Sequence, residues 1–265
     1  MRERGSPEPS RLFKVCVIAV LAALVGFIVL VVRNAKGETK IKEARRQIRD
    51  LVSAIESYES KYDAPPVCQE AKNSVTAKCP DLTFGTINRV SAGKNPFLTN
   101  NRGEKLFPTF SRENNGYQNS NAEVIAILLD LLKFRNGDPT VNTDHARNSD
   151  HVVFLKAKQA SDAISPGIGT DGVYRDPWGN PYIITFDMNG DGRCRDALYR
   201  IQTVSSFRSG ATGFNGLRNY LDPGGFTSDF EAKVSVMVWS YGPDGKADHN
   251  PADRPPNKDN VLSWK

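Results

Sequence analysis

The sequence lacks the short motifs on which most recognisable enzyme families depend. It contains no GxSxG or HExxH pattern, and no glycine pattern of the Walker type. Paired CxxC cysteines are absent too, and the three histidines, His145, His151 and His249, are not at the spacing typical of zinc ligands. We therefore expect neither catalytic activity nor a zinc site.

Cysteine is scarce. Of the four cysteines, Cys16 lies in an apolar run and Cys194 stands alone. Cys68 and Cys79 bracket a short polar loop, and a disulfide between them would fit an oxidising compartment. The spacing leaves two possibilities open, which are a Cys68–Cys79 disulfide and two separate thiols.

Charge of either sign is absent from residues 15–32, a run of eighteen residues. A helix of that length spans roughly 27 Å, close to the thickness of the hydrocarbon core of a bilayer. A cleaved secretory signal has a shorter apolar region and needs a small residue where Arg33 stands. We therefore predict an uncleaved transmembrane anchor, whose residues expected to contact lipid include Val15, Leu21, Leu24, Phe27 and Val32.

The net positive charge belongs to the segment around this run. Residues 1–46 hold ten Lys or Arg and four Asp or Glu, whereas the rest of the chain holds 25 and 26. This distribution suits anionic lipid headgroups and gives no reason to expect a nucleic-acid partner. Because long C-terminal domains are translocated largely regardless of flanking charge, we expect the short N-terminus in the cytoplasm.

An amphipathic helix follows the apolar run. Apolar residues recur there in steps of three and four, at Ile41, Ala44, Ile48, Leu51, Val52, Ile55, Tyr58 and Tyr62. Pro65 and Pro66 cannot continue a helix, so the pattern ends before them. We predict one nearly continuous helix over residues 13–62.

The remaining sequence mixes loops, short helices and strands. Residues 95–118 are typical of a long surface loop, whereas Ser120 and Glu123 form a capping box that predicts a helix over residues 120–134. A short helix is expected over residues 150–160. Alternating aromatic and β-branched residues predict strands over residues 182–186 and 234–241, which belong to a small antiparallel sheet in the C-terminal half.

Two acidic segments are candidates for calcium binding. Asp187, Asn189 and Asp191 match the first half of a calcium loop, but Leu198 stands at the twelfth position, and an ion-free turn is the alternative. The second segment, residues 240–265, is rich in oxygen-bearing side chains, namely Asp244, Asp248, Asp253, Asp259 and Asn260, and the predicted calcium ligands among them are Asp244, Asp248, Asp259 and Asn260. A bound Ca²⁺ would hold this second segment in place. The alternative is a solvated tail, against which the apolar residues near its end (Val261, Leu262 and Trp264) argue.

Together these segments resemble the pseudopilins of type II secretion, most closely the major, G-type pseudopilin. The motifs that carry the resemblance are the helix exit "YESKYDAPP", the turn "DPWGNPYII" and the ending "WSYGPDGKAD…KDNVLSW". The resemblance covers residues 11–66 and 172–265 and leaves 67–171 as an insertion. It implies that Asp244 and Asp259 are calcium ligands, with Asn260 where the family often has a second acid.

The sequence departs from this family at the processing site. The family is cleaved after a glycine and has an early glutamate, whereas here Leu12 precedes Phe13 and Val17 stands at the glutamate position. A buried carboxylate in lipid is costly, so its absence makes residues 15–32 an easier permanent anchor. We therefore expect a relative of the pseudopilins that is retained in the membrane.

The resulting expectation is an α+β, pilin-like protein with a long N-terminal transmembrane helix packed on a small antiparallel sheet. Its parts are residues 1–36 (leader and anchor), 37–66 (helix continuation), 67–171 (insertion) and 172–265 (sheet and calcium-type loop). We expect a single-pass protein of the bacterial inner membrane, with its C-terminal domain in the periplasm. The predicted role is a structural subunit that contacts lipid, similar subunits or copies of itself, with no small-molecule substrate. The alternative is a tethered, calcium-stabilised module that presents residues 95–134 to a secreted protein or glycan.

Overall fold

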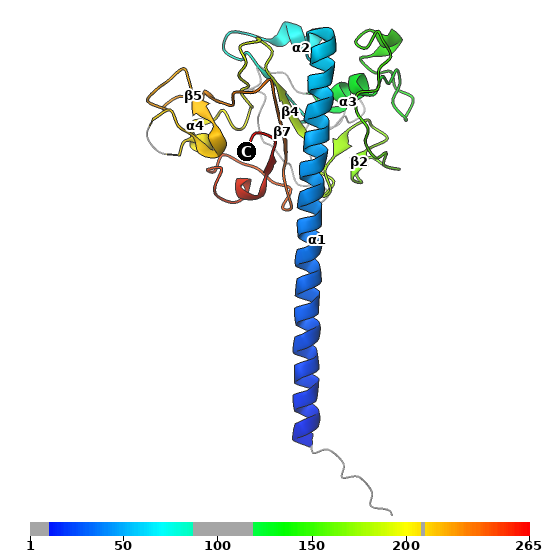
Figure 1. The fold of residues 1–265 in the computed structure, drawn as a ribbon, viewed down its shortest axis with the longest axis vertical. Helices are drawn as coiled ribbons and strands as arrows, with labels where there is room; N and C mark the ends of the chain where they lie inside the picture. Colours follow the sequence, from blue (N-terminus) through cyan, green and yellow to red (C-terminus); the bar gives the residue numbers. More distant parts are fainter. Residues whose placement is uncertain (1–10, 87–118, 208–209) are drawn as a thin grey trace, which may run out of the picture. The chain divides into compact units, whose positions relative to one another are not determined.

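The structure, a computed structural model, describes residues 11–86, 119–207 and 210–265 (Figure 1). The chain divides into two units, Met1–Lys40 and Ile41–Lys265, which are described separately. In the first unit, side chains before residue 35 are described only at Leu24, Phe27 and Val31. The predicted loop over residues 95–118 lies outside the described residues.

The described helices are α1 (Arg11–Tyr62), α2 (Gln69–Ser74), α3 (Ala122–Leu128) and α4 (Gln202–Ser205), with 3₁₀ turns η1 (Thr143–His145), η2 (Phe214–Gly216) and η3 (Asn257–Asp259). The main sheet is antiparallel, in the order β1 (Leu82–Phe84), β4 (Ile183–Phe186), β7 (Val236–Ser240), β8 (Val261–Leu262). Two small antiparallel pairs accompany it, β2 (Gly167–Ile168) with β3 (Tyr174–Arg175), and β5 (Arg218–Asn219) with β6 (Phe230–Glu231). The fold class is therefore α+β, as the sequence predicts.

Helix α1 is one uninterrupted helix, and it ends at Tyr62, just before the two prolines. Asp63 has a φ of 50°, which leaves the right-handed helical region. In the first unit, Leu24 and Phe27 are exposed, whereas the side chains of Val15, Leu21 and Val32 lie outside the described residues. Among the residues searched for such a segment, no helix is both long and apolar enough to cross a membrane.

Residues 41–62 of α1 form the first layer of the main core. The predicted stripe is buried: Ile48 is 2 % exposed, and Leu51 and Ile55 are both 0 % exposed. These side chains share one hydrophobic cluster with residues of β1, β4 and β7. Burying three large aliphatic side chains contributes about 1.5–3 kcal/mol each, so this face holds the helix on the sheet.

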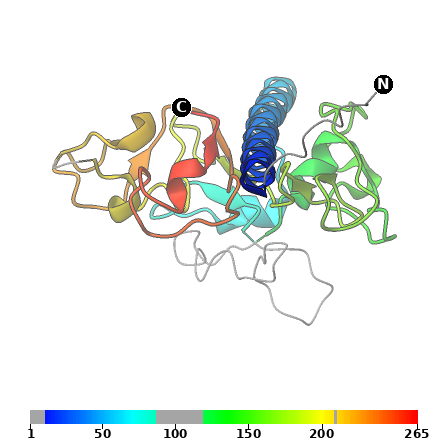
Figure 2. The same ribbon diagram turned by 90° about the horizontal axis from the view of Figure 1, so that it is seen from below.

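Both faces of the main sheet are covered, and the strands alternate between two cores. Ile184 and Val238 pack in the cluster that contains α1, whereas their neighbours Ile183 and Trp239 pack in a second cluster on the opposite face. This follows from the two-residue side-chain period of a strand. Figures 1 and 2 show α3 on one side of residues 41–62 and α4 with β5 on the other.

The segment 67–171 contributes to this core. Its strand β1 pairs with β4 at the sheet edge, and Thr83 lies opposite Thr185. Its helix α3 is buried along its whole length, from Ala122 to Leu128. The predicted helix over 120–134 is too long, because α3 ends at Leu128.

Two further local predictions are corrected. The N-cap of α3 is Asn121, whose side chain bonds the backbone of Tyr174 and Tyr182, so the predicted capping box does not form. Residues 150–160 are not helical. Their backbone is used elsewhere, since Phe154 N–H donates to the carbonyl of Leu128 at 2.8 Å.

Candidate functional sites

The "DPWGNPY" segment forms a tight turn built around the carboxylate of Asp176. Its Oδ1 accepts hydrogen bonds from the backbone N–H groups of Trp178 and Asn180, both at 2.9 Å. Its Oδ2 accepts from Ser240 Oγ at 2.5 Å. Burial raises the pKa of Asp176 to about 6. The turn is therefore fixed to the end of β7.

The same contact brings together two of the motifs on which the family resemblance rests. Ser240 opens the "SYGPDGKAD" segment, so the Asp176–Ser240 bond joins the turn to the C-terminal loop. Gly245 in that loop lies against Asn180: a Cβ at position 245 would approach the amide Oδ1 to 3.0 Å. The two motifs thus form one continuous structure.

Two of the four predicted C-terminal calcium ligands lie close together. The backbone N–H of Asp244 donates to Oδ2 of Asp259 at 3.3 Å. Gly242 permits this approach, because its φ is 68° and a Cβ there would lie 2.2 Å from the carbonyl oxygen of Asp259. Burial and the charge of Asp244 raise the pKa of Asp259 to about 6. Burial also raises the pKa of Asp244, as does the charge of Asp248.

The other two predicted ligands have different local roles. Asp248 accepts from the backbone and side chain of Asn250, at 2.7 and 2.9 Å. Asn260 donates its amide N–H to the hydroxyl of Tyr199 at 2.8 Å, and its buried Oδ1 has no hydrogen-bond partner in the described part of the chain. Two crowded carboxylates and an unsatisfied amide oxygen are hard oxygen donors of the type Ca²⁺ prefers, so the residues suit that ion in chemistry.

The chain end returns to the core, as the apolar residues near it predict. Val261 is buried and pairs with Ser240 in the sheet. The rings of Trp264 and Tyr199 meet edge to face, with centroids 5.1 Å apart. The segment 240–265 is therefore not a solvated tail.

The second acidic loop uses its carboxylates internally. Asp187 accepts from the backbone of Gly190 and Gly192, both at 2.7 Å. Asp191 accepts from Arg193 N–H and forms an ion pair with its guanidinium at 3.2 Å. Because these oxygens already close the turn, the structure favours the turn interpretation of Asp187, Asn189 and Asp191.

The described residues contain no disulfide between Cys68 and Cys79. Cys68 Sγ accepts from the N–H of Ala71 at the start of α2, whereas Cys79 Sγ donates to the carbonyl of Asp81, both at 3.4 Å. The two sulfurs thus have different local partners. Burial raises the pKa of the Cys79 thiol, and more strongly that of Cys194. A raised pKa keeps the thiols of Cys79 and Cys194 protonated and weakly nucleophilic.

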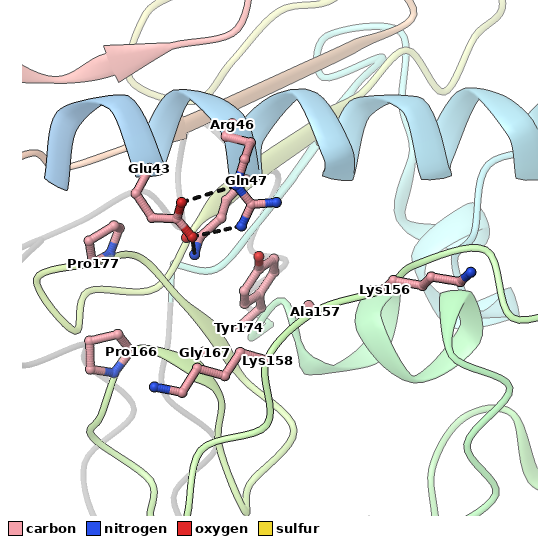
Figure 3. Close-up of a pocket in the computed structure, with 10 residues that line it drawn as sticks. All are labelled: Glu43, Arg46, Gln47, Lys156, Ala157, Lys158, Pro166, Gly167, Tyr174 and Pro177. Atoms are coloured by element: carbon pink, nitrogen blue, oxygen red, sulfur yellow. Dashed lines mark hydrogen bonds and ion pairs between the residues drawn. The ribbon is translucent and has the colours of Figure 1, made fainter. Parts of the chain in front are cut away.

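A surface pocket of about 470 Å³ lies between α1 and the loops that precede and follow β2 and β3 (Figure 3). Glu43 organises its α1 side by accepting from Arg46 at 2.7 Å and from Gln47 at 2.8 Å. Gln47 in turn accepts from the hydroxyl of Tyr182 at 2.6 Å. The opposite wall includes Lys158. The pocket is lined by charged side chains together with apolar ones, such as Pro166 and Pro177.

Sequence reasoning missed a cluster formed by Asp130, His145 and His151. His145 Nδ1 lies 2.8 Å from Asp130 Oδ1, and His151 Nδ1 lies 3.5 Å from Asp130 Oδ2. The spacing of the two histidines matches no common ligand pattern. The third member of the cluster, Asp130, follows α3 in the sequence and lies fifteen residues before His145. Only the fold brings the three side chains together.

Comparisons of the chain with protein-family models, with curated proteins and with solved structures found no match.

Proposed function

We propose that this protein is a membrane-anchored, pseudopilin-like structural subunit of a type II secretion or type IV pilus-like assembly. The observation that carries the proposal is the burial of Ile48, Leu51 and Ile55 against the sheet. A helix that is the first layer of its globular unit is the arrangement a pilin-type subunit requires. In an independent tethered module, the helix that follows the anchor would not need to form part of the hydrophobic core.

The apolar run makes the N-terminal half of this helix suited to contact with lipid. Residues 15–32 carry no charge, and Leu24 and Phe27 lie exposed in the structure. Small residues in this run (Ala19, Ala22, Ala23 and Gly26) would permit close approach between neighbouring helices. In the proposed role, copies of the chain or related subunits pack through this segment in the inner membrane, with Ile41–Lys265 in the periplasm.

Calcium completes the proposal as a stabiliser of the C-terminal loop. Asp244 and Asp259 would hold the ion, with Asn260 Oδ1 as a further oxygen donor. The bound charge would offset the burial and the neighbouring negative charges that raise the pKa of both carboxyl groups. Because this loop contacts the "DPWGNPY" turn at Asn180, its order affects the sheet end as well.

Co-purification tests the assembly role. Two copies with different affinity tags are expressed in one bacterial cell, and membranes are solubilised in mild detergent. We expect one tag to recover the other, and Gly26→Leu to reduce the recovery because it blocks close helix approach. Ile28→Leu, which conserves volume, is the matched control. Recovery that is absent, or equal in both variants, would contradict assembly through this helix.

The pocket in Figure 3 favours a second candidate, a tethered binding module. Its occupant would contact the Glu43–Arg46 pair and Lys158. The surface expected from residues 95–134 draws no support from α3, which is buried, and residues 95–118 lie outside the described part of the chain. A module of this kind would be recovered as a monomer in the co-purification experiment.

A further inference from the structure

The cluster of Asp130, His145 and His151 has the donors of a transition-metal site. In the described part of the chain, it is the one group of three such side chains whose ligand atoms lie within 4.8 Å of one another. The two imidazole rings meet at 70° with centroids 3.6 Å apart, and both present Nδ1 to the carboxylate. Each oxygen of the Asp130 carboxylate therefore lies near a different ring nitrogen.

The distances suit a small tetrahedral ion. With Zn–N and Zn–O bonds of about 2.0–2.1 Å, ligand atoms around zinc lie roughly 3.3 Å apart. In the structure His145 Nδ1 lies 2.8 Å from Oδ1 of Asp130 and His151 Nδ1 lies 3.5 Å from Oδ2, and one ligand atom from each of the three residues lies within 4.8 Å of the other two. A bound ion would replace the hydrogen that now joins carboxylate and imidazole, and the side chains would shift to bring one ligand atom of each residue to roughly 3.3 Å from the others.

A buried amide orients the carboxylate. Asn142 is 0 % exposed, and its Nδ2 donates to Asp130 Oδ1 at 2.9 Å. Asn142 is itself fixed, since its Oδ1 accepts the N–H of Arg147 at 3.0 Å. Outer hydrogen bonds of this type hold metal ligands in position and strengthen binding.

The site is open on one side. The side chain of Asp130 is 10 % exposed, that of His145 27 % and that of His151 58 %. An ion can therefore enter from solvent, and a water molecule can supply a fourth ligand. Two imidazole nitrogens distinguish this site from the C-terminal loop, because Ca²⁺ prefers oxygen donors alone.

We propose that Asp130, His145 and His151 bind a divalent transition-metal cation of the Zn²⁺ class. The ion joins the end of α3 to residues 142–151, the segment that holds the last turn of α1. In that segment the carbonyl of Arg147 accepts from the hydroxyl of Tyr58, and Asn148 Oδ1 accepts from the hydroxyl of Tyr62 at 3.0 Å. The metal would therefore reinforce the attachment of α1, whether or not the chain assembles.

The test is a Zn²⁺ titration of the full chain in detergent micelles, after removal of metal, in competition with a chromophoric chelator. We expect one site per chain and at least a tenfold weaker affinity for His151→Asn. Asparagine tolerates the φ of 56° at position 151, so the variant is expected to fold. His249→Asn, which removes an exposed histidine elsewhere, should bind as the unsubstituted chain does.

Asp130→Asn is the second variant, because it removes the charge and retains the shape. Co²⁺ provides an independent readout, since a tetrahedral site produces visible absorption bands that both variants should lose. The proposal is overturned if the unsubstituted chain binds no Zn²⁺. It is also overturned if His151→Asn and Asp130→Asn bind as tightly as His249→Asn, or if only substitution of the cysteines abolishes binding.

Discussion

Asp259 accepts a hydrogen bond from the backbone N–H of Asp244 at 3.3 Å, although fourteen residues separate the two. The contact closes the C-terminal loop, where burial and the charge of Asp244 disfavour the ionised form of Asp259. Without a cation, the loop carries an electrostatic cost at neutral pH. A divalent ion would convert that cost into a stabilising interaction.

Calcium removal should therefore destabilise the full chain in detergent. Saturating Ca²⁺, at about 100 times its dissociation constant, would contribute roughly 2.7 kcal/mol to the free energy of unfolding. For a chain of this size that corresponds to a melting temperature about 5–10 °C higher than in chelator. Asp244→Ala should abolish the difference, whereas Asp253→Ala, at an exposed acid, should retain it. Identical melting curves with and without chelator would exclude the ion.

The helix–sheet contact should be sensitive to cavities. Leu51→Ala removes a side chain that is 0 % exposed and should lower the free energy of unfolding by about 2–5 kcal/mol. Leu132→Ala, at a position 37 % exposed, is the matched control and should cost under about 1 kcal/mol. Urea unfolding in detergent measures both. Equal effects would mean that residues 41–62 do not form part of the core.

Stability should fall as pH rises from about 4 to 7, and Asp81 should account for part of the fall. Burial raises the pKa of Asp81 from 3.8 to about 7, so in that window the folded chain retains a proton that the unfolded chain has lost. The contribution is at most about 4 kcal/mol, at 1.36 kcal/mol per pH unit. Asp81→Asn should flatten the dependence measured by denaturation at pH 5 and pH 8, whereas Asp138→Asn should not. An unchanged slope would contradict the assignment.

The proposed anchor predicts that the protein stays with the membrane during alkaline carbonate extraction. Leu24→Arg should release a measurable fraction, because an arginine at the centre of a spanning helix costs about 2.5–3.5 kcal/mol on insertion scales. Leu24→Ala is the control and should remain in the membrane pellet. If the unsubstituted chain is extracted completely, residues 15–32 do not anchor it.

Local patterns in the sequence predicted the parts of the fold that depend on local chemistry. The apolar stripe and Pro65 define α1, and alternating aromatic and β-branched residues define β4 and β7. Long-range hydrogen bonds decided the parts that the sequence did not predict. Residues 150–160 are not helical because Asn148 and Leu128 bind their backbone N–H groups.

The candidate sites can also be divided into those that depend on local sequence and those that depend on long-range contacts. The crowding of Asp244 and Asp259 was predictable only through the family resemblance, since the contact depends on the close approach at Gly242. The turn at Asp187 is local, and it is one of the two alternatives that the sequence left open. The Asp130–His145 contact joins the residues after α3 to the turn η1. This contact depends on the path of the chain between them, so no spacing rule could have indicated it.

The central claim is that copies of this chain, or of related subunits, pack through the apolar half of α1. Photo-crosslinking in intact cells tests it most directly, with a photoreactive amino acid at Leu24 or Phe27, both exposed, or at the buried Leu51 as the control. The account predicts a ladder of crosslinked species from positions 24 and 27 and none from position 51. Crosslinks to lipid alone at positions 24 and 27 would contradict it.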